Sequence, residues 1–173
     1  MSIETKDKTG LLDQIDEVVS QLIELMFLVD ENDVNTIPYQ DGWTAGQLFE
    51  HVTKSTGSLA KAMKQEGAQA DRDPGEHIEN LKKIFLDFSS KMKAPEFIVP
   101  LQGWYEKSSS IQKLGGSFQQ LRENAKNTDL TVIIKGTPLG DATKWEMLHF
   151  ILYHTQRHLH QMKKIYEALK NRL

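Results

Sequence analysis

The feature that most constrains this fold is the spacing of its apolar residues, which recur at intervals of three and four along five separate segments. This spacing gathers apolar side chains on one face of an α-helix, so each segment is predicted to be a helix with one buried face. The segments are 11–30, 44–65, 73–92, 109–126 and 143–170. They predict an all-α fold, an antiparallel four-helix bundle with an additional helix outside the common core.

Three of the predicted helices have recognisable start signals. Thr44 and Thr143 are each followed three residues later by a side chain that completes a capping box, Gln47 and Glu146 respectively. The run 73–76 (Asp-Pro-Gly-Glu) combines an aspartate cap, a proline in the first turn and a returning glutamate. These caps predict where the second, third and fifth helices begin.

Two connections break the helical rhythm. Residues 94–107 hold two prolines around a short extended run, 97–99, and are expected to cover one end of the bundle. Residues 130–134 read as one short strand, followed by a turn over 136–141. We find no internal repeat, and residues 1–173 are predicted to form a single domain, since this length can bury a core without disulfides.

Charge and composition exclude several classes of function. A net charge of -3 gives no electrostatic case for binding nucleic acid or an anionic membrane. The absence of cysteine leaves only nitrogen and oxygen as metal ligands, and it excludes a cysteine nucleophile. The polar start, MSIETKDKTG, lacks a signal-peptide core, and no apolar run approaches the roughly 18 residues of a membrane span. A cytoplasmic location is therefore expected.

The fifth predicted helix carries four of the six histidines. At about 100° per residue, His158 falls inside the apolar sector of this helix and His154 on its flank. His149 and His160 project to nearly the opposite side, so they are expected to face solvent. The pattern thus separates two inward histidines from two outward ones.

The two inward histidines form a candidate metal site. Side chains one helical turn apart can bind a single ion, as in zinc-binding helices. The alternative is that both are ordinary half-buried residues. An imidazole in an apolar sector needs a partner for each nitrogen, and two protonated rings would repel, so a shared metal would remove both difficulties. A metalloprotease is excluded, because its glutamate base is replaced by Thr155, and Glu146 and Glu167 lie two turns or more away.

His51 is the third candidate ligand. It lies at the edge of the apolar stripe of the second predicted helix. A ligand that reaches a neighbouring helix would occupy such a position, but many surface histidines do so too. Periodicity therefore leaves its role open.

Two runs of sequence resemble motifs of the DinB-like (DinB/YfiT) proteins. The run 43–51 (WTAGQLFEH) resembles the tryptophan-led start of that family's second helix, which ends in a metal-binding histidine. The run 154–161 (HTQRHLHQ) is similar to the second motif, two histidines four residues apart and a glutamine three residues later. Leu159 and His160 replace the usual Arg-Gly of the family, on the outer face of the helix. The run looks closer to a poorly characterised branch of the superfamily than to its studied thiol transferases.

The resemblance covers most of the chain and carries several implications. It implies a four-helix bundle of DinB-like type, with His51, His154 and His158 holding a divalent metal near one end of the helices, and often a homodimer. Similar proteins use low-molecular-weight thiols in transfer or isomerisation reactions, and others are proposed hydrolases. Imidazole ligands suit zinc or nickel, and iron and copper are also compatible.

Three nitrogen ligands would leave coordination positions open, which is typical of catalytic sites. Bound water could then supply hydroxide, or a bound thiol could lose its proton without a protein base. Gln161 could orient a ligand or substrate from a position behind the site. Arg157, on the adjacent outer flank, could pair with an anionic group if that edge of the helix borders the cleft, but a solvated arginine is expected instead. Three classes of function follow: a metal-dependent transferase or hydrolase acting on a small-molecule substrate, a non-catalytic metal or ligand binder related to stress, and a structural bundle whose histidines only pack.

Overall fold

The structure is a computed structural model that describes residues 3–172. Its elements are five α-helices, two short 3-10 helices and three strands. The α-helices are α1 (Thr5–Leu28), α2 (Ala45–Ala62), α3 (Ile78–Phe85), α4 (Lys107–Lys126) and α5 (Lys144–Lys170). The 3-10 helices are η1 (Glu31–Asp33) and η2 (Glu96–Ile98), and the strands are β1 (Ala68–Gln69), β2 (Val132–Thr137) and β3 (Gly140–Thr143).

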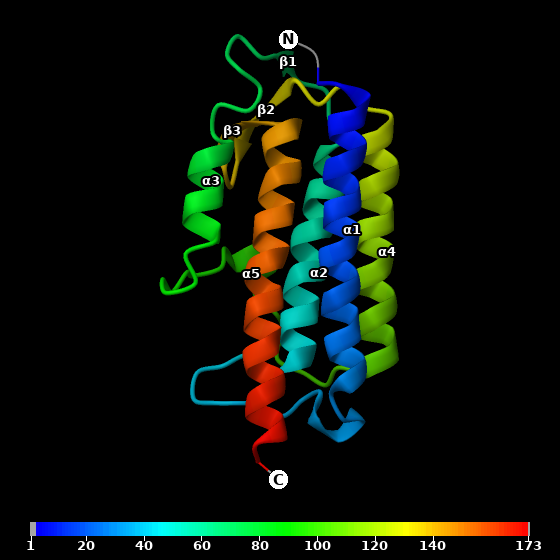
Figure 1. Cartoon of the computed structure of the whole chain (residues 1–173), viewed down its shortest axis with the longest axis vertical. Coiled ribbons are helices and arrows are strands. Elements are labelled where there is room, and N and C mark those ends of the chain that lie inside the picture. Colours follow the sequence, from blue (N-terminus) through cyan, green and yellow to red (C-terminus); the bar gives the residue numbers. More distant parts are fainter. Residues whose placement is uncertain (1–2, 173) are drawn as a thin grey trace.

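The four long helices lie side by side (Figure 1). Helices α1 and α5 run in one direction, and α2 and α4 run in the other. Helix α1 packs against α4 and α5, and α2 packs against the same two partners. The short α3 packs against α5 on the outside of this group, within the connection that returns the chain from the end of α2 to the start of α4 (Figure 1).

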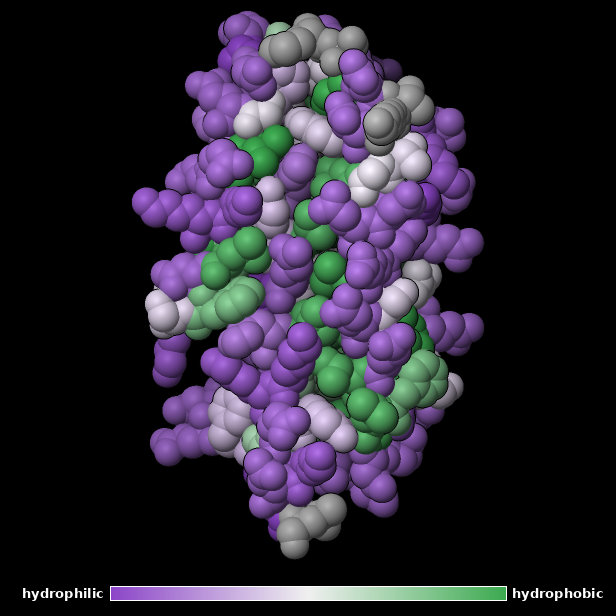
Figure 2. All heavy atoms as spheres, in the orientation of Figure 1, coloured by the Kyte–Doolittle hydropathy of each residue, from purple (hydrophilic) through white to green (hydrophobic). Residues whose placement is uncertain are grey.

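The apolar stripes of the long helices meet in one core. Leu22, Phe49, Leu121, Leu148 and Met162 represent α1, α2, α4 and α5 there, and each is almost completely excluded from solvent. Burying such side chains stabilises the fold by about 1.5–3 kcal/mol each. Hydrophilic side chains cover most of the face shown in Figure 2, with apolar residues visible in a narrow band down its middle.

Both predicted capping boxes are confirmed. The N–H of Gln47 donates to the Thr44 hydroxyl at 3.1 Å, and the N–H of Thr44 donates to the Gln47 side chain at 3.0 Å. Thr143 and Glu146 repeat the arrangement at 3.0 and 2.9 Å. These bonds satisfy donors that the first turn of a helix leaves free, and they fix the starts of the two helices that carry the histidines.

The third predicted helix is wrong at both ends. Residues 74–77 form turns and the helix begins at Ile78, because the backbone N–H of His77 donates to Glu146 of α5 at 3.0 Å. The helix ends at Phe85, where Asp87 starts a turn by accepting from the N–H of Ser89 at 3.1 Å. Contacts with α5 and a local side-chain bond thus override the helical spacing that continues to Met92.

The chain is mostly helical, as predicted, and the short strand expected at 130–134 proves to be part of a larger feature. Three short strands form an antiparallel sheet in the order β1-β2-β3. Strand β2 is longer than the predicted strand, and it pairs with β1 and β3 through two separate registers. Gly136 and Gly140 adopt positive φ angles of 66° and 82° in this hairpin, a conformation that glycine adopts without a steric cost. The run 97–99, predicted to be extended, instead lies largely in η2. Within residues 3–172, no helix is long and apolar enough to cross a membrane.

Candidate metal centre

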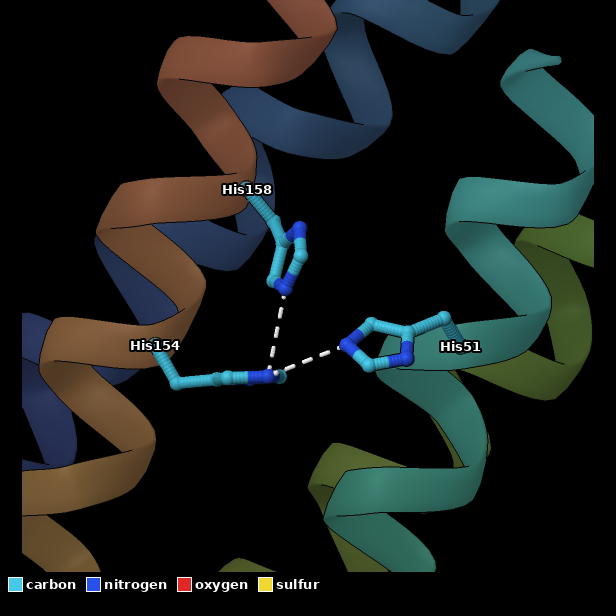
Figure 3. A group of neighbouring side chains, drawn as sticks. All are labelled: His51, His154 and His158. Carbon is cyan, nitrogen blue, oxygen red and sulfur yellow. Dashed lines mark hydrogen bonds between the residues drawn. The ribbon is translucent and has the colours of Figure 1, made fainter. Parts of the chain in front are cut away.

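Three imidazoles from two helices converge on one point (Figure 3). His51 comes from α2, and His154 and His158 come from α5, one turn apart. The Nε2 atom of His154 lies 3.1 Å from Nε2 of His51 and 3.1 Å from Nε2 of His158. The structure therefore brings together the three histidines that the sequence singles out.

All three rings are removed from solvent. His51, His154 and His158 are 2%, 5% and 7% exposed. Burial penalises the imidazolium form, so it lowers the pKa of His51, lowers that of His154 well below its usual value and lowers that of His158 to about 3. At neutral pH the rings are neutral, and each carries one N–H and one lone pair.

Hydrogen bonds on the far side of two rings fix where those lone pairs point. Nδ1 of His51 lies 2.9 Å from the carbonyl oxygen of Ile98, and Nδ1 of His158 lies 2.9 Å from Oε1 of Gln161. An oxygen of this kind only accepts, so both Nδ1 atoms carry the proton and both Nε2 atoms present lone pairs to the centre. The N–H of His154 could satisfy only one of them. The three rings alone therefore leave at least one lone pair facing another nitrogen without a donor.

The geometry fits a divalent ion. Metal–nitrogen bonds of about 2.0–2.1 Å in tetrahedral geometry place ligand nitrogens about 3.3 Å apart. The two separations from Nε2 of His154, both 3.1 Å, are close to that value, and one candidate ligand atom from each histidine lies within 4.8 Å of the other two. Nδ1 of His154 is buried without a partner among the described residues, so no hydrogen bond on the far side of this ring fixes its tautomer. Three protein ligands would leave at least one position free for water or substrate.

Side chains on either side of His51 hold the segment that carries the Ile98 carbonyl. Glu50 accepts from the N–H of Leu101 at 2.8 Å and from the hydroxyl of Tyr105. One turn further along α2, Lys54 donates to the carbonyl of Val99 at 3.1 Å. Because η2 and the residues after it are tied to α2 in this way, Ile98 meets His51 from behind. No sequence motif indicated this contact, since the group involved is a backbone carbonyl 47 residues away.

Aromatic rings enclose the three histidines. Trp43, just before α2, lies with its ring centroid 4.8 Å from that of His51 and is stacked at 17° on His158. Phe150, with its centroid 5.1 Å away, and Phe85 of α3 flank His154. These walls restrict the rotamers of the imidazoles and keep water from their sides.

A cavity of about 1160 Å³ borders the histidines. Its lining comes from the segment 39–43, α2, the segment 85–99, the β2–β3 hairpin and α5, and it includes all three imidazoles. Ligand sites for small molecules usually have volumes of about 300–1,000 Å³. An ion held by the histidines would therefore lie beside a space large enough for a substrate.

The carboxylates near this region are poor candidates for a catalytic base. Both oxygens of Glu146 are bound to the Arg72 guanidinium, at 2.7 and 2.8 Å, and they also accept from the N–H groups of Thr143 and His77. Among the described residues that line the cavity, Asp41 is the one carboxylate. The exclusion of Glu146 as a base, argued from its spacing, is thus supported by its contacts.

The expected exposure of His149 and His160 is wrong. His149 is half-buried against Trp145, at a centroid distance of 4.7 Å, and its burial lowers its pKa to about 4. His160 is also half-buried and stacks on Phe88 at 4.3 Å and 9°. Helix α3 and the segment after it cover a second face of α5, which the helical wheel assigned to solvent. Neither residue belongs to the three-histidine group.

The other two residues considered on α5 also have defined contacts. Gln161 lies behind His158, as the bond to Nδ1 shows. Arg157 is not solvated as expected, because its guanidinium donates to the carbonyls of Asp87 and Ser90, at 2.8 and 2.5 Å, and to that of Phe85 at 3.4 Å. It thereby fixes the segment after α3 as one wall of the cavity.

Comparisons with known proteins agree with the resemblance seen in the sequence. A sequence model of the DinB superfamily matches residues 11–162, a range that includes all three histidines. The uncharacterised protein YuaE of Bacillus subtilis (strain 168) is 26% identical over 151 residues, which cover 85% of this chain and 91% of YuaE. No solved structure matches the chain significantly.

Proposed function

The chain belongs to the DinB superfamily, and from that premise we propose that it binds one divalent metal ion through the Nε2 atoms of His51, His154 and His158 and uses it in a transfer reaction between a thiol and a small molecule. Zinc and nickel suit three imidazoles best, and iron is compatible. The proposal includes the fold: we take the four long helices to form a four-helix bundle of DinB-like type.

The observation that carries the proposal is the fixed orientation of two lone pairs. Ile98 and Gln161 hold the protons of His51 and His158 on Nδ1, so their Nε2 atoms can only accept. A cation at the centre satisfies these lone pairs together with that of His154. A purely structural cluster would need a donor there, and the rings can supply only one.

A transfer reaction is favoured by two features of the cavity. When bound, the ion would lower the pKa of a coordinated thiol, so no side-chain base is required. This matters because the described residues that line the cavity include a single carboxylate, Asp41. The cavity volume of about 1160 Å³ exceeds the usual range for one small ligand, as expected for a site that receives two molecules.

The remaining residues of the site orient the imidazoles and enclose the cavity. Trp43, Phe85 and Phe150 keep the rings in place and exclude water from their faces. Arg157 holds the wall formed by the segment after α3. Hydrolysis by metal-bound water is the alternative reaction at the same centre, and non-catalytic storage of a metal or ligand is the alternative without chemistry.

The test begins with metal analysis of untagged protein purified without a nickel column. We expect about one equivalent of metal, and its loss in His154→Ala, while His77→Ala serves as the control because His77 is exposed and does not line the cavity. A panel of low-molecular-weight thiols and electrophiles, with and without chelator, then separates the reactions. Thiol-dependent turnover that the chelator abolishes supports the transferase, and turnover without thiol supports the hydrolase. Metal-free protein in every preparation and after reconstitution would contradict the proposal.

A further inference from the structure

The cavity beside the histidines has a charge opposite to that of the chain. The whole protein holds 24 acidic and 21 basic residues. The described lining nevertheless contains four lysines and one arginine against a single carboxylate, Asp41. The lysines lie on three different parts of the chain: Lys91 and Lys93 after α3, Lys135 on β2 and Lys164 on α5.

None of these four lysines has a partner within the described part of the chain. Each is exposed, and none lies within ion-pair or hydrogen-bonding distance of a carboxylate there. Other basic residues are paired, as Arg122 is with Asp13 and Asp16. Arg157 donates to backbone carbonyls, which do not neutralise its charge. The pKa of the Asp87 carboxyl is lowered mainly by hydrogen bonds within its own turn and in part by the nearby charge of Arg157. The charged side chains that line the cavity nevertheless sum to a net positive charge, and low-dielectric walls concentrate the field of such a charge.

Apolar side chains alternate with these cations. Phe88, Met92 and Phe97 line the cavity although they are 40%, 45% and 55% exposed. Deeper in, Phe150 and Ile134 are buried and face the same space. Large apolar residues left exposed around a concave site are typical of ligand-binding grooves.

We infer that the cavity binds an organic anion with an apolar body, whose carboxylate or equivalent head lies among Lys91, Lys93, Lys135 and Lys164. The body would pack against the phenylalanine-rich lining, with its far end toward the histidines. This inference deepens the proposed function, on which it rests, because it names the class of molecule presented to the same centre. The anion binds through charge and apolar contact, so its binding does not itself require the metal.

The binding test uses anilinonaphthalene sulfonate, a fluorescent amphipathic anion, with metal-loaded and metal-free protein. Octanoate, octanol and octylamine then compete as ligands with matched apolar bodies and different charge. We expect octanoate to displace the probe at least tenfold more effectively than octanol, by the Coulomb attraction of several cations, and octylamine to be weakest. Added salt should reduce this difference, since the lysines are exposed.

A variant in which glutamine replaces the four cavity lysines should weaken octanoate binding about tenfold and leave octanol binding unchanged. Its substitutions are Lys91→Gln, Lys93→Gln, Lys135→Gln and Lys164→Gln. The matched control is Lys61→Gln/Lys82→Gln/Lys83→Gln/Lys113→Gln, which removes the same charge from exposed lysines outside the cavity. Equal losses in the two variants, or equal binding of octanoate and octanol, would overturn the inference. Binding to anionic vesicles but not to soluble anions would also overturn it, in favour of a membrane surface.

Failure of this inference can be told apart from failure of the proposed function. Metal content is measured on the same preparations, and the lysine variant should keep its metal. Anion binding in His154→Ala would support the inference even if no metal is ever found. If the protein is loaded with metal but does not distinguish octanoate from octanol, the proposed metal centre is retained and only the inferred anion site is contradicted.

Discussion

The Nε2 atoms of His51 and His154 lie 3.1 Å apart, although 103 residues separate them in the chain. Neither ring can reach the other without the packing of α2 against α5. Because Ile98 fixes the proton of His51 on its outer nitrogen, the short distance places a lone pair of His51 against His154. The relationship suits two ligands of one ion, and it motivates the first prediction.

Removal of any ligand should abolish metal binding. His51→Ala, His154→Ala and His158→Ala should each reduce the metal content from about one equivalent to near zero, since two imidazoles bind weakly. The double variant His149→Ala/His160→Ala is the control on the same helix. It should keep its metal but lose stability, because both rings are packed against aromatic neighbours. Mass spectrometry of the metal and thermal unfolding measure the two effects, and metal loss in the control would show that the ligand set is wrong.

Acid should destabilise the metal-free protein partly through His149. Burial lowers its pKa to about 4 in the folded state, whereas an unfolded histidine has a pKa of about 6.5. Between these values the unfolded chain binds more protons, so the free energy of unfolding falls as pH falls from about 6.5 to about 4. Between about pH 7 and pH 5 this group contributes up to about 2 kcal/mol of the loss.

Urea unfolding of metal-free protein at several pH values measures this contribution. His149→Gln removes the titrating group, so its stability should depend less on pH than that of the wild type. His77→Gln is the control, because His77 is exposed. The same pH dependence in wild type and His149→Gln would show that His149 does not titrate as its burial requires.

Gln161 should act on the metal through His158. Its Oε1 accepts from Nδ1 of that ring at 2.9 Å, and such partners orient a ligand and raise its basicity. Gln161→Ala should weaken metal affinity about 10–100-fold, and Gln161→Glu should restore it. Competition with a chromophoric chelator gives the affinity. Gln120→Ala, at an exposed position on α4, is the control, and equal affinities in the two alanine variants would refute the role.

The ion pair between Arg72 and Glu146 should be essential for stability. Glu146 is fully buried, and Arg72 binds both of its oxygens. Glu146→Ala removes the buried carboxylate that binds Arg72, which keeps only the half-exposed Glu76 at 3.7 Å and two backbone carbonyls, and it also removes a capping box. A loss of about 3–5 kcal/mol in the free energy of unfolding is therefore expected. Glu123→Ala breaks a surface pair with Lys126 and should leave the unfolding midpoint unchanged. Similar midpoints for the two variants would contradict this reading of the buried pair.

Periodicity and caps alone correctly placed the two helices that carry the histidines. The capping boxes at Thr44 and Thr143 involve residues three apart, so local sequence decides them. The i, i+4 spacing of His154 and His158 on a helix likewise fixes their common face before any other element packs there. His51 became a candidate ligand at an edge position, and the family resemblance, rather than its periodicity, favoured it.

Other features depended on partners distant in sequence, and the tertiary structure decided them. Helix α3 begins and ends where contacts with α5 and the Asp87 turn dictate, although the apolar spacing continues to Met92. Strand β2 pairs with β1, which precedes it by about 60 residues, and with β3, which directly follows it. The segment after α3 covers His160, which the helical wheel predicted to be exposed. The proton position on His51 depends on the carbonyl of Ile98, a group that every residue possesses and no side-chain pattern distinguishes. Local hydrogen bonds and the face of a helix on which a side chain lies depend on residues that are neighbours in the sequence. The burial of a histidine and the nitrogen that carries its proton depend on which surfaces pack together, and only the folded chain determines that packing.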